Sequence, residues 1–284
     1  MERGFEVVVI DNLFTGNIKN VNKDAKFYKI DITNFEKLRK IFRKEGPNIL
    51  NHHAAHNNFA RSFEDPIFDL NVNVVGTINL IRASIESKVE KIIYASSGGL
   101  TYGDKVKLPI KENHPLNPLG PYAISKLAAE FYIKVLCKRY GINYSILRYA
   151  NVYGPRQDVS KEVGIVSIMI DKILKNQDVT IRGSGKQTRD FIYVKDVVSA
   201  NYKVLFKGDD EIFNIGTGKE TSIIELFNLI KELLKRPQIK LFHKEAIEGD
   251  ERRCKFDITK AKKILKWKPK YTLERGLRET IRYY

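Results

Sequence analysis

A tyrosine and a lysine stand four positions apart at Tyr122 and Lys126, in the segment YAISK. In an α-helix this spacing places both side chains on one face, one turn apart. An ammonium group near a phenol favours the phenolate and lowers the phenol pKa from its usual value of about 10. Such a tyrosine can accept and return a proton near neutral pH. The same spacing arises by chance on amphipathic helices, so the surrounding segments are needed to interpret it.

The first two thirds of the sequence alternate between strand-like apolar runs and segments of helical spacing. Strands are predicted at 5–10, 27–30, 49–53, 91–95 and 144–147, and helices at 35–42, 71–87 and 122–140. This alternation favours an α/β fold with a parallel sheet and helices on both faces. Right-handed crossovers place the carboxyl ends of all such strands along one edge, where a ligand crevice is expected. Polar residues follow several of these strands, at 11–12, 31, 52–58, 96–97 and 148–156.

The pattern changes after Arg148. Residues 151–157 predict a Pro/Gly turn, 164–176 a helix and 179–182 a short strand. The segments 189–193 and 213–215 are interpreted as late strands that return to the main sheet. A helix at 223–234 and the basic C-terminal stretch are expected to form a smaller lobe.

The composition excludes several classes of protein. Of the 284 residues, 43% are apolar, which is enough for a folded core and excludes overall disorder. No apolar run approaches the ~20 residues needed to cross a bilayer, and no signal-peptide pattern is present. Cys137 and Cys254 cannot form a disulfide framework or a zinc site by themselves. His52, His53 and His56 lack the glutamate of a zinc-binding H-E-x-x-H helix, so no metal is expected in what we interpret as a cytoplasmic protein.

The formal net charge is +16, and residues 231–284 hold 17 Lys and Arg against 8 Asp and Glu. These basic residues interleave with a helical apolar pattern and form no basic arm, and nucleic-acid-binding motifs are absent. A solvated basic surface, which also attracts anionic substrates such as nucleotide diphosphates, is favoured over nucleic-acid or membrane binding.

Further motifs surround the Tyr122–Lys126 pair. They are VVVIDNLFTG from residue 7, HHAAH from 52, YASSGGLTYGD from 94, NPLGPYAISK from 117, LRYANVYGPRQ from 147, QTRDFIYVKD from 187 and EGDERR from 248. With these motifs in this order, the sequence resembles the extended short-chain dehydrogenase/reductase family. Within that family it resembles the NAD-dependent nucleotide-sugar epimerases and dehydratases, and most closely the 4-epimerases of UDP-glucose and UDP-galactose. The resemblance implies a Rossmann-like, doubly wound parallel sheet with a smaller C-terminal substrate lobe.

The resemblance implies NAD as the cofactor. Asp11 would bind the adenosine ribose hydroxyls, with Asn12 beside it, and a carboxylate there disfavours the 2′-phosphate of NADP. The further cofactor contacts implied are Asp31 and Ile32 near the adenine, His53, Ala54, Ala55 and Asn73 along the cofactor, and Tyr122 and Lys126 at the nicotinamide riboside.

The resemblance also implies a reaction on a UDP-sugar. Tyr122, assisted by Lys126, would remove the proton of the sugar 4-hydroxyl while the C4 hydride passes to NAD, and the hydride would return to the opposite face of a 4-keto sugar. Ser97 would supply a hydroxyl beside the sugar. Asn151, Arg189 and Asp250 would bind the nucleotide sugar, with Arg189 on its diphosphate.

The sequence departs from the family pattern at its start and at Gly98, and Ile247 stands where relatives often have a diphosphate-binding Arg. A dinucleotide-binding unit places a G-x-x-G-x-x-G turn about 20 positions before its acidic residue, whereas only ten residues, including Gly4, precede Asp11. The first strand and the glycine-rich turn are therefore missing from this sequence, and we expect Met1 to be an internal methionine of a longer protein; a genuinely shortened protein is the rival interpretation. Gly98 stands where many epimerases carry Ser or Thr, and Gly98-Gly99 lacks the Asp-Glu pair of the related dehydratases.

Residues 1–150 with about 190–218 are therefore expected to bind NAD, and about 151–189 with 219–284 to bind the nucleotide sugar. A homodimer is expected, in which the 71–87 and 122–140 helices of two subunits form a four-helix bundle. The alternatives are an epimerase or reductase on a UDP-N-acetylhexosamine or UDP-uronic acid, and a truncated remnant that binds nucleotide sugars without catalysis.

Overall fold

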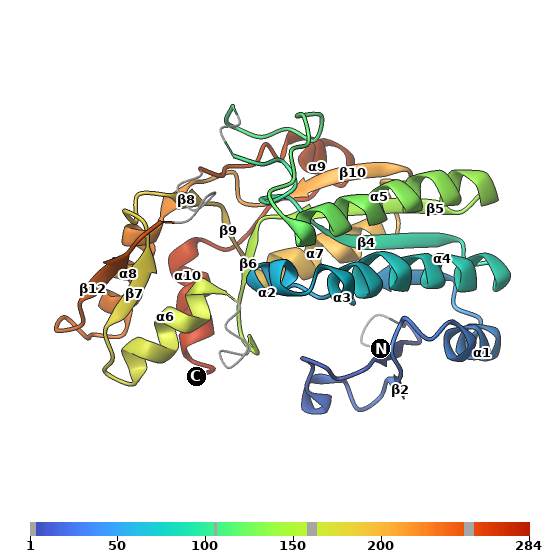
Figure 1. The fold of residues 1–284 in the computed structure, drawn as a ribbon, viewed down its shortest axis with the longest axis horizontal. Helices are drawn as coiled ribbons and strands as arrows, with labels where there is room; N and C mark the ends of the chain where they lie inside the picture. The colour runs from blue at the N-terminus through green and yellow to red at the C-terminus, as the bar shows by residue number, and fades with distance from the viewer. Residues whose placement is uncertain (1–3, 105–106, 158–163, 247–252) are drawn as a thin grey trace. The chain divides into compact units, whose positions relative to one another are not determined.

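The computed structural model describes residues 4–104, 107–157, 164–246 and 253–284 (Figure 1). The chain forms two compact units, which are described separately below. The first unit contains Met1–Ala95 and Gly120–Ile146, and the second contains Ser96–Leu119 and Leu147–Tyr284. Within the described ranges, no helix is long and apolar enough to cross a membrane.

Parallel strands form the centre of the first unit, as predicted. β1 (Val8–Asp11) pairs in parallel with β2 (Lys26–Lys29), with Val8 opposite Lys26. β3 (Ile49–His52) pairs in parallel with β4 (Lys91–Ser97), and β5 (Asn143–Tyr149) lies next to β4. β1, β2 and β3 each lead into a polar loop at the carboxyl end of the strand, where the sequence places a ligand crevice.

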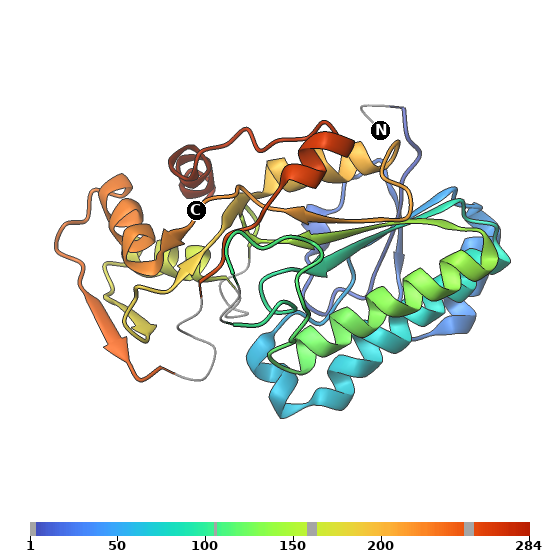
Figure 2. The ribbon, with the colours of Figure 1, turned by 90° about the horizontal axis from the view of Figure 1, so that it is seen from above.

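Helices cover these strands. The long predicted helix is α5 (Pro121–Tyr140), and α1 (Phe35–Glu45) follows β2. The helix predicted at 71–87 begins as a π-helical turn, η2 (Asn71–Val75), and continues as α4 (Gly76–Glu86), which lies beside α5 (Figures 1 and 2). Two short helices were not predicted, α2 (Phe59–Glu64) and α3 (Pro66–Leu70), because each is too short to show apolar periodicity.

Side-chain caps fix where these helices begin. Asn34, Asn58 and Asp65 each accept a hydrogen bond from a main-chain N–H of the first turn of α1, α2 and α3. The helices and strands then bury a common apolar core between them. Its fully buried members include Leu38, Ile81, Ile92, Ile93, Ile133 and Ile146.

The second unit is built from short strand pairs. They are β6 (Asn151–Tyr153) with β9 (Phe191–Tyr193), β7 (Val179–Arg182) with β12 (Leu241–Lys244), and β8 (Thr188–Arg189) with β11 (Thr221–Ser222). β10 (Glu211–Ile215) runs beside the end of β5, in agreement with the prediction that this segment returns to the main sheet. Its helices are α6 (Ile165–Leu174), α7 (Val194–Val204), α8 (Ile223–Leu233), α9 (Thr259–Ile264) and α10 (Leu273–Ile281).

Two local predictions need correction. The segment 189–193 was expected to return to the main sheet, but β8 pairs with β11 and β9 pairs with β6, outside the four-stranded sheet of β3, β4, β5 and β10. The segment 151–157 was expected to be a Pro/Gly turn, but its first three residues form β6. Val152 and Tyr153 have high strand propensity, and they pair with Ile192 and Tyr193 of β9, far away in the sequence. The Gly and Pro that suggested a turn follow only at Gly154 and beyond.

Candidate active site

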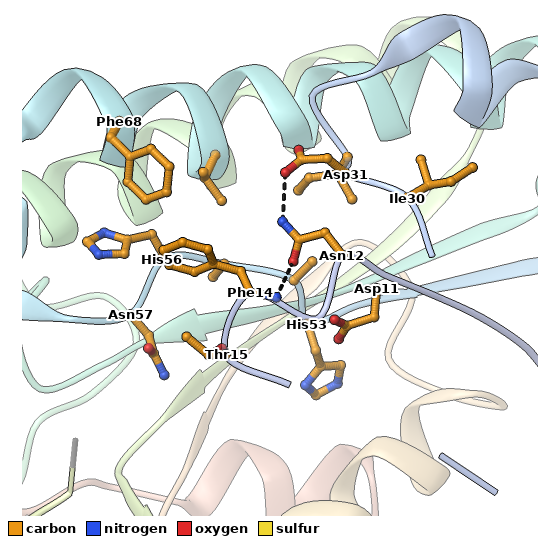
Figure 3. Close-up of a pocket in the computed structure, with 14 residues that line it drawn as sticks. Asp11, Asn12, Phe14, Thr15, Ile30, Asp31, His53, His56, Asn57 and Phe68 are labelled. Atoms are coloured by element: carbon orange, nitrogen blue, oxygen red, sulfur yellow. Dashed lines mark hydrogen bonds between the residues drawn. The ribbon is translucent and has the colours of Figure 1, made fainter. Parts of the chain in front are cut away.

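A pocket lies at the carboxyl ends of β1, β2 and β3, within the first unit (Figure 3). Ala54 and Ala55 contribute small side chains to it, and Ile30 and Ile32 contribute apolar walls. Its position at the carboxyl ends of strands that pair in parallel, β1 with β2 and β3 with β4, agrees with the crevice expected from the sequence. The remaining lining residues are Asp11, Asn12, Phe14, Thr15, Asp31, His53, His56, Asn57, Phe68 and Val72.

A hydrogen-bond chain fixes the loops after β1 and β2. The Asn12 amide donates to Asp31 Oδ2 at 2.7 Å and accepts from the Phe14 main-chain N–H at 2.9 Å, as Figure 3 shows. Partial burial acts to raise the pKa of Asp31, but hydrogen bonds from the side chain and main chain of Thr33 and from Asn12 hold it below its usual value. Asp31 is therefore a carboxylate at neutral pH, and both of its oxygens already accept hydrogen bonds from the loops after β1 and β2.

Asp11 is the carboxylate that the loops leave available. Its Oδ1 accepts a hydrogen bond from the Leu13 N–H at 2.6 Å, and no described residue donates to its Oδ2. Oδ2 of Asp11 can therefore accept a hydrogen bond from a ligand hydroxyl, and the apolar and small side chains beside it can contact a flat ring. Adenosine has both a hydroxyl-bearing ribose and such a ring. Its charge opposes a phosphate in the same place. The residues present therefore fit the adenosine half of NAD.

The structure brings together most of the residues predicted to bind the cofactor. Those that line this pocket are Asp11, Asn12, Asp31, Ile32, His53, Ala54 and Ala55. Asn73 does not line it, because its side chain is buried and hydrogen-bonds the main chain of His56. Sequence reasoning missed Phe68 and Val72, which reach the pocket from helices; Phe14, Thr15, Ile30, His56 and Asn57 could have been found as neighbours of the predicted residues.

Tyr122 and Lys126 lie in the first two turns of α5, in the same unit as the pocket. The main-chain N–H of Tyr122 donates to Ser62 Oγ of α2 at 3.2 Å. Lys126 is buried, with its Nζ 4.1 Å from the centroid of the Tyr94 ring. Burial lowers the pKa of Lys126 to about 7, while the negative charges of Glu130 and Asp69 act in the opposite direction. The lysine therefore titrates near neutrality.

His52 is a buried, uncharged side chain next to this lysine. Burial lowers the pKa of His52 well below its usual value, and the charge of Lys126 adds to this effect. Its Nε2 lies 2.9 Å from Thr77 Oγ1, and the Thr77 hydroxyl donates to the carbonyl of Asn73 at 2.6 Å. Nε2 therefore carries the proton of the neutral ring. The histidine segment 52–56 thus serves hydrogen bonding and lining of the pocket.

In the second unit, Ser97 ends β4 and its carbonyl accepts a hydrogen bond from Thr101 Oγ1 at 2.6 Å. Gly98 follows it, and a Cβ at this position would overlap the ring of Phe256. Phe256 is fully buried and packs edge-on against Tyr102. The glycine in place of a family Ser or Thr is thus explained by the neighbouring phenylalanine.

Asn151 and Arg189, both predicted to bind the nucleotide sugar, lie on either side of Asp190 in the fold. The Asn151 N–H donates to the carbonyl of Asp190 at 2.9 Å, and Arg189 precedes it in β8. The buried Asp190 carboxylate accepts from Thr217 Oγ1 and N–H, and from two further main-chain N–H groups. This hydrogen bonding holds the segment that carries Arg189, and Asn151 is joined to that segment through the carbonyl of Asp190. Ile247 and Asp250 lie outside the described residues.

Comparison with known proteins gives a consistent result. Residues 1–216 match the family described as "NAD dependent epimerase/dehydratase family". The chain is 46% identical over 288 residues to a Methanocaldococcus jannaschii protein provisionally named UDP-glucose 4-epimerase, covering 100% of this chain and 92% of that protein.

Two solved structures share the fold. The Thermotoga maritima UDP-glucose 4-epimerase with UDP-glucose has a TM-score of 0.97 and 41% identity, covering 99% of this chain and 91% of that one. The Thermus thermophilus UDP-glucose 4-epimerase in complex with NAD has a TM-score of 0.93 and 36% identity, covering 99% and 92%. These findings confirm the Rossmann-like fold, the resemblance to the extended short-chain dehydrogenase/reductase family and NAD as the cofactor. The chain belongs to the NAD dependent epimerase/dehydratase family.

Proposed function

We propose that this protein is a nucleotide-sugar 4-epimerase that interconverts UDP-glucose and UDP-galactose through a transient 4-keto sugar. The Tyr122–Lys126 pair carries the proposal. Residues four apart in α5 are neighbours on one helix face, and the ammonium of Lys126 is removed from water, where its charge acts strongly on a neighbouring phenol. The names of the similar proteins, and the UDP-glucose bound to one of them, support the choice of substrate.

In this proposal the first-unit pocket binds the adenosine end of NAD. Asp11 accepts hydrogen bonds from the ribose hydroxyls, and Asn12 and Asp31 keep the two loops in place. Ile32 lies along the adenine, His53, Ala54 and Ala55 line the path of the cofactor, and Asn73 supports that path through the main chain of His56. Residues 1–150 with about 190–218 then form the cofactor-binding part, and 151–189 with 219–284 the sugar-binding part.

Tyr122 is the general base of the proposed reaction. It takes the proton of the sugar 4-hydroxyl and returns it after the sugar has turned over, while the charge of Lys126 favours the phenolate. NAD, when bound, would supply the hydride chemistry at C4 that makes the 4-keto sugar accessible. Ser97 orients the sugar by hydrogen bonding, and Asn151, Arg189 and Asp250 hold the nucleotide diphosphate portion, with the guanidinium of Arg189 as its charged partner.

We also propose that two copies associate as a homodimer in the cytoplasm. α5 exposes Ile124, Phe131 and Val135, the last of them 66% exposed, and η2 exposes Val75. α4 and η2 run beside α5 in the same unit. Apolar side chains on two neighbouring helices favour burial against an equivalent pair, which yields a four-helix bundle.

The test is an epimerase assay on the purified protein with NAD and UDP-galactose, with UDP-glucose formation as the readout. We expect turnover in the wild type, and a loss of about 10²- to 10⁴-fold in Tyr122→Phe. Tyr140→Phe is the matched control, since this exposed tyrosine ends the same helix. Undiminished turnover in Tyr122→Phe would contradict the general-base role.

Parallel assays separate the substrate classes. Faster conversion of UDP-N-acetylglucosamine or UDP-glucuronate than of UDP-galactose would make the UDP-glucose assignment wrong while leaving 4-epimerisation in place. Formation of a 4-keto-6-deoxy sugar would instead indicate dehydratase chemistry. Ser97→Ala tests the hydroxyl role separately: wild-type turnover in this variant would remove Ser97 from the proposal.

A further inference from the structure

Asp69 of α3 is a buried carboxylate that joins three other segments of the first unit. Its Oδ2 accepts a hydrogen bond from Ser125 Oγ at 2.5 Å. Its Oδ1 accepts from His56 Nδ1 at 2.9 Å and from Asn73 Nδ2 at 3.1 Å. A fully buried carboxylate is costly unless such donors satisfy it, so this arrangement stabilises one geometry of α3, η2, α5 and the loop after β3.

On one side, the network holds the helix that carries the proposed general base. Ser125 lies between Tyr122 and Lys126 in α5. Its hydroxyl donates to Asp69, accepts from Asn73 Nδ2 at 3.0 Å, and lies 3.0 Å from the carbonyl oxygen of Tyr122. A displacement of Ser125 would therefore move Tyr122 and Lys126 with it.

On the other side, the network holds the wall of the cofactor pocket. The Asn73 side chain pairs with the main chain of His56, accepting from its N–H at 2.8 Å and donating to its carbonyl at 3.0 Å. The His56 ring donates through Nδ1 to Asp69, because a carboxylate can only accept. Its Nε2 is buried without a hydrogen-bond partner in the described part of the chain. Asp69 is thus the group that orients this ring.

We propose that Asp69 is a positioning residue that holds the Tyr122–Lys126 face of α5 in register with the pocket wall at His56. The proposal rests on the proposed function, in which Tyr122 is the general base. It goes further, because it assigns a role to a residue that touches neither the cofactor nor the substrate.

Asp69 also acts on the charge of Lys126. Among the described residues, the titratable groups that act on this lysine or contact it are His52 from β3, Tyr94 from β4, Asp69 from α3 and Glu130 from α5, and Tyr122 lies one turn before it in α5. Of these, Asp69 and Glu130 raise the lysine pKa against the effect of burial. Removing the Asp69 charge therefore moves the Lys126 titration to lower pH.

The test compares Asp69→Asn with Asp65→Asn. Asp65 caps the same helix through a hydrogen bond from the Phe68 N–H, and asparagine caps equally well, so this control should match the wild type. The first readout needs no activity: ¹³C NMR of lysine-labelled protein, with the Lys126 signal identified by its loss in Lys126→Arg. We expect this signal to titrate about one unit lower in Asp69→Asn.

The second readout is kinetic. We expect Asp69→Asn to lower kcat about 10²-fold, with KM for the UDP-sugar unchanged within about twofold, because misplacement affects the reacting groups more than binding. An unshifted Lys126 titration, or equal losses in kcat and in 1/KM, would overturn the positioning role. If Asp69→Asn fails to fold, Ser125→Ala takes its place: a lowered kcat supports the proposal and an unchanged kcat overturns it. A wild type inactive on every nucleotide sugar would refute the proposed function, whereas the NMR titration would still report on Asp69.

Discussion

The ring of Phe256 fills the space into which a side chain at residue 98 would project. The two residues are far apart in the sequence, and the contact makes glycine necessary at the end of β4 for steric reasons. No left-handed backbone conformation is involved, since the φ angle of Gly98 is not positive. The glycine is therefore coupled to one named neighbour, and the coupling can be measured.

We expect Gly98→Ser to lower the free energy of unfolding by about 2 kcal/mol, because an added side chain in a filled core forces its neighbours to move. In Phe256→Leu the smaller side chain makes room, so Gly98→Ser should cost less in that background. A double-mutant cycle by urea denaturation gives the coupling energy. Equal costs of Gly98→Ser in both backgrounds would show that Phe256 is not the obstacle.

The buried lysine predicts a pH dependence of stability. Lys126 titrates near pH 7 in the folded protein and near 10.5 when unfolded, so between these values the unfolded chain binds more protons. The free energy of unfolding should therefore rise from pH 7 to pH 9, and burial of the charged lysine destabilises the protein most below pH 7. Lys126→Met should flatten this rise and raise Tm at pH 6.5. Thermal denaturation between pH 6 and pH 9 measures it, with exposed Lys138→Met as the control. A rise that persists in Lys126→Met would contradict the assignment.

The carboxylate of Asp11 predicts the choice between the two nicotinamide dinucleotides. Asp11→Asn removes the charge that opposes a 2′-phosphate. We therefore expect NADH to bind more weakly, and the ratio of the affinity for NADH to that for NADPH to fall by about tenfold. Fluorescence titration with both dinucleotides measures the two dissociation constants. Asp24→Asn, at an exposed turn of the same unit, should leave both unchanged. A preference unaltered in Asp11→Asn would mean that another residue discriminates.

The carboxylate of Asp190 predicts a stability effect in the second unit. Its Oδ2 accepts main-chain N–H groups of Gly218 and Phe256, and its Oδ1 accepts from Thr217. An amide cannot accept on both sides, so Asp190→Asn should cost about 2 kcal/mol by leaving buried donors unpaired. Urea denaturation measures this cost. Asp178→Asn is the control, because this exposed carboxylate accepts one N–H in the described part of the chain, from Lys240, and an amide oxygen can replace it. A cost as small as that of the control would show that the donors find other partners.

The exposed apolar side chains of α5 predict the oligomeric state. We expect a dimer by light scattering after size-exclusion chromatography, and a monomer for Val135→Lys, because a buried unpaired charge opposes association. Val198→Lys is matched to it, since Val198 is 61% exposed on α7 of the other unit. A wild-type monomer, or a dimer that survives Val135→Lys, would place the interface elsewhere or remove it.

Short-range patterns in the sequence were sufficient for the parallel strands, for α5 with Tyr122 and Lys126 on one face, and for the polar loops that carry Asp11, Asp31 and His53. Each of these features depends on the spacing of apolar residues and on the residue types just after a strand. Both are properties of residues that are close together in the sequence. The roles of Asp69, Phe256 and Phe68, and the strand at Asn151, could not be read in this way. They arise from contacts between segments distant in the sequence: Asp69 matters because Ser125 and His56 reach it, and Gly98 because Phe256 fills its space. The spacing of residues along the chain does not indicate which distant side chains pack together. The roles of these residues could therefore be recognised only in the folded structure.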